Sequence, residues 1–442
     1  MSDGGTAMTG TGFSTPRGLA VSTHDPEVAA LLHAFEEELL GYGQGAAIVF
    51  TAIARDPECA IAQAYGAAAH LFALTRAAIA RARPYLDAAR AGRADSARER
   101  GVIAAILAWG DGQPQLAIAR LTAVLDNEPR DLFAAKLLQY LQFASGRSAD
   151  MLRTATMLVR HHELDGRVHA MHAFALGETG DARGAERAAR RGIALTDDPW
   201  AHHALAHAFD AMGRARDGVD WLESHAAAWA DCSSFLYTHN WWHAALFHLE
   251  LGDMARAIEL YDARVWARRH DYCQDQINAV ALLARLELAG GDVGDRWAEL
   301  AREIAPFAGD AVDGFLDLHY AYALARSDAG DALGDLIAAA DAHAGRDEAP
   351  WRMMMPDALA GMIAHATGDY PRAAMRLGHV HDQLHLAGGS VVQRDLFARI
   401  AVDALLRSGD IAGARALARR AAPAVRRCHA RLIVDTADTL AA

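Results

Sequence analysis

The 442-residue chain is poor in cysteine and proline, has no excess of positive charge and contains no long apolar run. Its four cysteines, Cys59, Cys232, Cys273 and Cys428, form no Cys-x-x-Cys pair, which argues against a disulfide framework and fits a reducing compartment. A formal net charge of −13 argues against binding to nucleic acid or to an anionic membrane surface. A membrane-spanning helix needs roughly 20 apolar residues, and no run approaches that length. We therefore expect a cytoplasmic protein that binds neither partner.

What the chain does contain is a repeated helical pattern. Alanine is abundant, which favours helix, and no stretch alternates as a strand does. A glycine recurs about every 34 residues and, beyond Gly213, about every 39. These glycines are Gly112, Gly146, Gly180, Gly213, Gly252, Gly291, Gly330, Gly368 and Gly409. In six cases an aspartate follows, namely Asp181, Asp253, Asp292, Asp331, Asp369 and Asp410. Such a pair predicts the elbow of a helical hairpin, because glycine ends one helix and aspartate caps the next.

The spacing predicts an all-α solenoid of tetratricopeptide-like hairpins curled around a concave pocket. Prolines Pro57, Pro129 and Pro199 are expected in the first turns of helices that open new hairpins. Residues 1–22 read as a flexible lead and 23–442 as one solenoid. Within it we expect divergent hairpins over 23–112, regular repeats over 113–213 and longer repeats over 214–442. The inner wall should come mainly from the first helix of each hairpin.

Two histidine pairs on successive inner helices are the strongest functional signal. His203 and His207 lie four residues apart, as do His239 and His243, so each pair occupies one helix face. Imidazole suits transition metals, and we predict that the two pairs share one ion, zinc or iron. Neither pair has the glutamate of a zincin motif, because Ala204 or Asn240 occupies its place.

Several other residues are predicted to support this site. Asp317 and His319 are expected to complete or orient the ligand shell, and Trp241 to line the pocket. Arg394 and Asp395 could hold an acidic substrate or orient a ligand, or they could instead tie the end of the solenoid together.

The residues also resemble the tetratricopeptide repeat protein 38 family. The motifs that carry this resemblance are His-Ala-Leu-Ala-His at 203–207, His-Asn-Trp-Trp-His at 239–243, Leu-Tyr-Asp at 260–262, Val-Gly-Asp-Arg-Trp at 293–297, Asp317 with His319, and Gly-Gly-Ser-Val-Val-Gln-Arg-Asp-Leu-Phe at 388–397. The resemblance implies a cytoplasmic repeat protein, and it assigns no reaction. At Val391 bacterial relatives have His or Asn, so a ligand from that position is not expected here.

Three functions stay open on this basis. The first is a metal-dependent enzyme acting on a small molecule in a histidine-rich pocket. The second is an adaptor that binds a partner peptide in its concave groove, although such grooves usually present Lys, Arg and Asn rather than His and Trp. The third is a metal-free small-molecule binder in which the histidines serve as acid and base.

Overall fold

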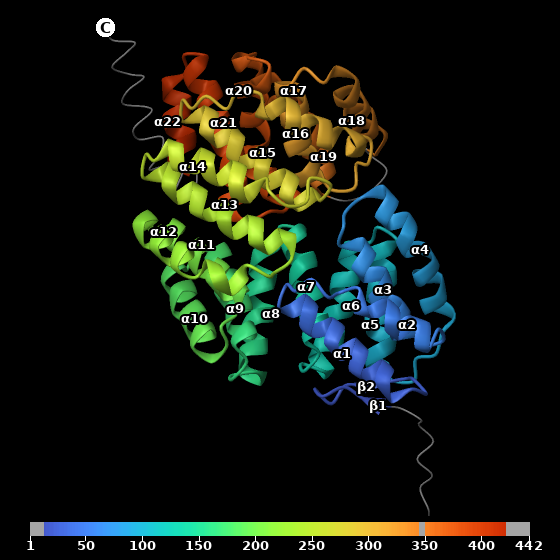
Figure 1. Cartoon of the computed structure of the whole chain (residues 1–442). Coiled ribbons are helices and arrows are strands. Elements are labelled where there is room, and N and C mark those ends of the chain that lie inside the picture. Colours follow the sequence, from blue (N-terminus) through green and yellow to red (C-terminus); the bar gives the residue numbers. More distant parts are fainter. Residues whose placement is uncertain (1–12, 344–349, 421–442) are drawn as a thin grey trace, which may run out of the picture. The chain divides into compact units, whose positions relative to one another are not determined.

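A computed structural model describes residues 13–343 and 350–420, and these residues are almost entirely helical (Figure 1). The described residues form all-α, tetratricopeptide-like helical hairpins, as predicted. The one sheet in the described part pairs two strands of two residues, β1 (Phe13–Ser14) and β2 (Ala20–Val21). Cys428, whose free thiol was predicted, lies outside the described residues. No helix in the described part is both long and apolar enough to span a membrane.

Contacts divide the chain into two compact units, residues 1–141 and 142–442. The first unit contains β1 and β2, then α1 (Pro26–Leu40), α2 (Ile48–Arg55), α3 (Ala60–Leu71), α4 (Arg76–Ala91), α5 (Ala97–Gly110), α6 (Pro114–Asn127) and most of α7 (Leu132–Ala144). Residues 13–22, expected as part of a flexible lead, hold the two strands. The prediction of one continuous solenoid over 23–442 stays a prediction.

The second unit continues with hairpins from α8 to α22. Its helices are α8 (Ser148–His161), α9 (Gly166–Glu178), α10 (Ala182–Leu195), α11 (Pro199–Met212), α12 (Ala215–Ser224), α13 (Ser234–Glu250), α14 (Met254–Leu260), α15 (Cys273–Leu288), α16 (Arg296–Ile304), α17 (Gly314–Arg326), α18 (Gly330–His343), α19 (Pro350–Ala366), α20 (Tyr370–Val380), α21 (Val391–Arg407) and α22 (Ile411–Arg420). Short 3-10 or π turns extend four of these repeats, at Ala226–Trp229, Tyr261–Val265, Ala305–Phe307 and His381–Ala387. These turns and the longer α13 and α15, of 17 and 16 residues, account for the longer repeats.

Most elbows form as predicted. Seven of the nine glycines adopt a positive φ: Gly112, Gly146, Gly180, Gly213, Gly252, Gly368 and Gly409. The prediction is wrong at Gly291 and Gly330, because Gly290 and Asp328 take the left-handed conformation instead. Side chains of Asp181, Asp253 and Asp369 cap the following helices. Asp292 instead accepts a hydrogen bond from the amide of Gly294. Asp331 is the second residue of α18.

Among the prolines, only one prediction is confirmed. Pro199 occupies the first turn of α11. Pro57 and Pro129 lie in the loops before α3 and α7.

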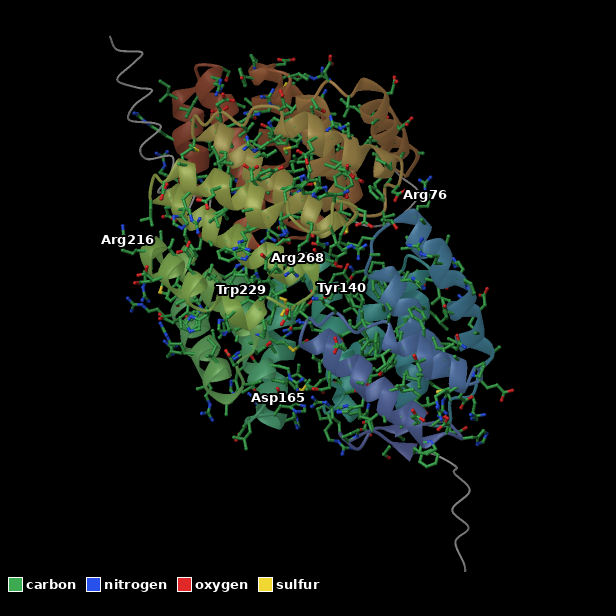
Figure 2. The ribbon with its side chains drawn as sticks, in the orientation of Figure 1. Arg76, Tyr140, Asp165, Arg216, Trp229 and Arg268 are labelled. Carbon is green, nitrogen blue, oxygen red and sulfur yellow. The ribbon has the colours of Figure 1, made fainter. Side chains whose placement is uncertain are left out.

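First and second helices of each hairpin differ in burial, and this difference sets where a site can lie. Every residue of α15 from Asp275 to Leu286 is buried, whereas α10 buries only Gly184, Ala185, Ala189 and Gly192. A helix buried all round belongs to the interior, and one with a single buried face covers it. In Figure 2, Arg216 extends outward from the outer helix α12, while Trp229 is fully buried. Polar residues on the first helices are therefore enclosed by protein.

The segment just before α21, the last inner helix of the second unit, lies against the first residues of that unit. It is preceded by Gly388 and Gly389, which both have positive φ. A Cβ on Gly388 would lie 2.7 Å from the carbonyl oxygen of Ala144, so glycine allows this close approach. Helix α21 packs against both α15 and α19. Gly388 and Gly389 thus allow α21 to pack inside this unit.

The first unit has a polar network in its own core. Arg98 donates to Asp131 at 2.8 Å, and their side chains are 5% and 0% exposed. Tyr65 donates to Glu36 at 2.9 Å. Burial and the nearby Asp131 raise the pKa of Glu36 to about 8. Arg98 also donates to the carbonyl of Ala20, so the network anchors β2.

Candidate metal centre

Two adjacent inner helices of the second unit carry the four histidines. Helix α11 begins at Pro199, where the side chain of Asp198 accepts the amide of Trp200, and it ends at Gly213 with φ 70°. Helix α13 packs directly against α11. Because residues four apart share a helix face, each helix presents a pair of imidazoles toward its neighbour.

The structure brings all four imidazoles together. One ring nitrogen from each of His203, His207, His239 and His243 lies within 4.8 Å of the other three. The Nε2 atoms of His203 and His207 are 3.0 Å apart. The rings are only 1%, 4%, 2% and 1% exposed, respectively, so the group is sealed from bulk solvent.

Burial lowers the pKa of three of the four histidines and keeps them uncharged at neutral pH. It lowers the pKa of His207 to about 3, helped by the nearby His239, and the pKa of His239 to about 4, opposed by a hydrogen bond with Asn278. The pKa of His243 is held well below its usual range by burial and then by His207 and His239. Neutral imidazole is the form that binds metals, so at neutral pH these rings are ready as ligands.

Aromatic side chains enclose the four histidines and explain this burial. Trp200 lies against His203 with ring centroids 4.2 Å apart, and Phe174 contacts both His203 and His207. Phe235 and Trp242 stack on His239, each with its ring centroid 5.1 Å away.

The predicted Trp241 lies elsewhere. It packs against Trp229, with ring centroids 5.1 Å apart, and beneath the guanidinium of Arg264. Consecutive residues on a helix point about 100° apart, and here Trp242, not Trp241, contacts the histidine group.

Two residues not predicted from the sequence contact the outer side of the group. The Oδ1 atom of Asn278, on α15, lies 2.8 Å from Nδ1 of His239. An oxygen of Glu178, at the end of α9, lies 3.9 Å from Nδ1 of His207. Oδ1 of Asn278 accepts the Nδ1 proton of His239 and leaves Nε2 for a ligand role, as outer-shell partners do in metal sites, whereas Glu178 lies beyond hydrogen-bond distance of His207.

The repeat spacing could have predicted the position of Asn278. Asn278 follows His239 by 39 residues, which is one repeat, so it occupies the equivalent place on the next inner helix. Glu178 offers no such signal beyond being an acidic residue near the end of an inner helix.

The remaining predicted residues are buried but lie outside the group of four. Nδ1 of His319 donates to the carbonyl oxygen of Phe315 at 2.8 Å, and burial lowers the pKa of His319 to about 4. Asp317 is buried on the same helix, α17. No described residue beyond the four histidines joins them in a group of possible metal ligands.

Arg394 and Asp395 are both engaged by protein groups. Arg394 donates to the carbonyl of Gly389 and lies 3.7 Å from Glu178. Asp395 pairs with Arg399 and lies 3.9 Å from Arg285, a buried residue that the sequence did not single out. Arg285 also donates to the carbonyl of Val392 at 2.7 Å, which holds α15 to α21.

No family model matches the chain. Similar solved structures are tetratricopeptide-type helical-repeat proteins, and at these identities the likeness concerns the fold alone. One is a Rap protein complexed with Competence and Sporulation Factor, at 7% identity over 93% of this chain and 99% of that one, with a TM-score of 0.44. Another is yeast Tom70, at 12% identity over 94% and 88% of the two chains, with a TM-score of 0.37. The tetratricopeptide domain of P58(IPK) is similar at 13% identity over 77% and 99%, with a TM-score of 0.24.

Proposed function

We propose that this helical-repeat protein is a metalloprotein in which His203, His207, His239 and His243 bind one transition-metal ion, zinc or iron, and that the ion serves chemistry on a small molecule. The observation that carries the proposal is the meeting of four buried imidazoles, with one ring nitrogen from each within 4.8 Å of the others. We also propose that the chain is related to the tetratricopeptide repeat protein 38 family. That relationship does not assign a reaction to the protein.

The surroundings of the rings support a ligand role. Nε2 of His243 is buried and has no hydrogen-bond partner among the described residues. Burying a polar atom without a partner is costly, and coordination of an ion removes that cost. The hydrogen bond from Nδ1 of His239 to Asn278 leaves Nε2 of His239 for the same ion.

The type of donor favours a reactive ion over a purely structural one. Structural zinc sites are built with cysteine thiolates, whereas histidine-rich shells occur in catalytic sites. Four neutral nitrogens leave the full charge of a divalent ion uncompensated by its ligands, which makes the ion a stronger Lewis acid. Zinc with four ligands would be saturated, while iron can accept further ligands such as water or dioxygen.

The adaptor alternative has less support in the second unit. Inner helices α15 and α17 are buried along nearly their whole length, from Asp275 to Leu286 and from Gly314 to Leu324. A peptide groove needs first helices with one exposed face, and these two have none over those residues.

Metal analysis of the purified full-length protein tests the proposal, with His243→Gln as the test variant and His319→Gln as its control. Both rings are 1% exposed and both have a lowered pKa, but only His243 belongs to the group. We expect about one ion per chain in the parent protein and in His319→Gln, and at least a tenfold loss of affinity in His243→Gln. Circular dichroism establishes that each variant is folded.

Two results would contradict the proposal. One is a parent protein that stays metal-free after purification without chelators and after incubation with zinc or iron(II). The other is a folded His243→Gln variant that keeps the parent's metal content and affinity.

A further inference from the structure

A carboxylate in the second unit connects the histidine group to the start of α21. The amide of Val391, the first residue of α21, donates to both oxygens of Glu178 at 3.0 Å, across 213 residues of sequence. Nη2 of Arg394, one turn further along α21, lies 3.7 Å from the same carboxylate. The Glu178 side chain is 1% exposed, so these contacts are shielded from water.

The same side chain faces a proposed metal ligand. One oxygen of Glu178 lies 3.9 Å from Nδ1 of His207, on the edge of the ring opposite the Nε2 atom that faces His203. Glu178 therefore stands between the histidine group and the N-terminus of α21. A helix N-terminus carries partial positive charge, so this end of α21 attracts the carboxylate from one side. A divalent ion in the histidine group would attract it from the other.

Resting on the proposed metal centre, we propose that Glu178 is a positioning residue that couples metal binding to the anchoring of α21. An imidazole that binds a metal through Nε2 becomes a stronger hydrogen-bond donor at Nδ1, which draws the carboxylate toward His207. The oriented carboxylate then holds the Val391 amide and Arg394 in one arrangement. Coupling of this kind is reciprocal, so a well-anchored α21 also raises metal affinity.

The position of Val391 permits a specific test. Val391 follows the N-cap Ser390 and is the first residue of the helix. Proline fits that position, because its fixed φ suits the helix start and no intrahelical bond needs its amide. Val391→Pro thus removes the hydrogen donated to Glu178 and keeps the helix. Val391→Ala is the matched control, because it shortens the side chain and keeps the amide.

Amide hydrogen exchange of the full-length protein, with and without one equivalent of zinc, measures the coupling. We expect zinc to slow exchange over residues 392–398 by at least fivefold in the parent protein and in Val391→Ala. In Val391→Pro and Glu178→Gln that slowing should fall below twofold. Zinc affinity, measured by competition with a chromophoric chelator, should weaken by roughly tenfold in Glu178→Gln, as outer-shell changes typically cause. The internal reference is helix α22, which contains none of the residues that contact Glu178 among those the structure describes.

The two proposals fail in different ways. Stoichiometric zinc binding without slower exchange in α21 would overturn the coupling and leave the metal centre intact. Unchanged zinc-dependent slowing in Val391→Pro would likewise overturn the role of Glu178. Failure of the parent protein to bind zinc or iron would remove the metal centre and the coupling together.

Discussion

The cores of the two units contain different kinds of polar cluster: paired charges in the first unit and histidine rings in the second. In the first unit a buried Arg98 is paired with Asp131, and Glu36 accepts a hydrogen bond from Tyr65. In the second unit four histidine rings lie together, and burial lowers the pKa of His207, His239 and His243. Opposite charges attract and compensate each other, whereas neutral imidazoles keep lone pairs available for an ion. The comparison teaches that a buried polar cluster is a candidate ligand site only when its members do not neutralise one another.

The largest effect should come from breaking the charge pair. Arg98→Met leaves the carboxylate of Asp131 buried without its cation, and losses of about 3–5 kcal/mol are typical of such changes. Urea unfolding followed by segment-resolved hydrogen exchange should show this loss in α5 and α7. A loss below about 1 kcal/mol would mean that the pair contributes little. Arg100→Met, a substitution at an exposed neighbour on α5, is the control.

Metal should stabilise the second cluster and leave the first unaffected. Free zinc at about a thousand times its dissociation constant stabilises a binding-competent fold by roughly 4 kcal/mol. Hydrogen exchange should therefore slow in α11 and α13 on adding zinc, and a chelator should reverse the effect. Equal slowing in α3 and α5 would indicate a nonspecific effect and would remove the contrast between the clusters.

Acid should weaken the metal-free second unit. The folded-state pKa values of His207 and His239 are lowered to about 3 and about 4, so the unfolded chain binds protons more readily below about pH 6.5. Their stabilising contribution is complete above that pH and is lost as the pH falls. Between pH 7 and 5 we expect a loss of about 2 kcal/mol for each such ring, measured in α11 and α13 by exchange corrected for intrinsic rates.

Alkali should weaken the first unit, so its pH dependence runs in the opposite direction. The pKa of Glu36 is raised to about 8, so its contribution is complete below about pH 4.5 and is lost as the pH rises through 8. Glu36→Gln keeps a neutral acceptor for Tyr65 and should change stability at pH 4, where Glu36 is protonated, by less than about 1 kcal/mol. It should also flatten the decline of α1 and α3 protection between pH 6 and 8. An unchanged decline would assign the pH dependence to another group.

Local spacing allowed much of the fold and the four histidines to be predicted. Each histidine pair is set by a four-residue spacing on one helix, and neighbouring repeats bring the pairs together. The predicted elbow positions were wrong at Gly291 and Gly330, because the chain turns one or two residues before these glycines. In such a loop only one of several neighbouring residues adopts the left-handed conformation, and the packing of the two helices determines which one.

Contacts between distant repeats could not be predicted in the same way. Glu178 meets Val391 across 213 residues, and nothing in either local sequence encodes that pairing. Which tryptophan faces the histidines depends on the rotation of α13 about its axis, because Trp241 and Trp242 point about 100° apart. Arg98 and Asp131 carry no shared local motif, so the cluster of the first unit was not predicted either.

The long separation between Glu178 and Val391 also has a consequence for biosynthesis. Ribosomes add about 5–20 residues per second, so the 213 residues between them take roughly 10–40 s to appear. During that interval the histidines of α11 and α13 have been made while α21 does not yet exist. If the proposed metal centre exists, a nascent chain has this interval in which to bind an ion before Val391 is made and can contact Glu178.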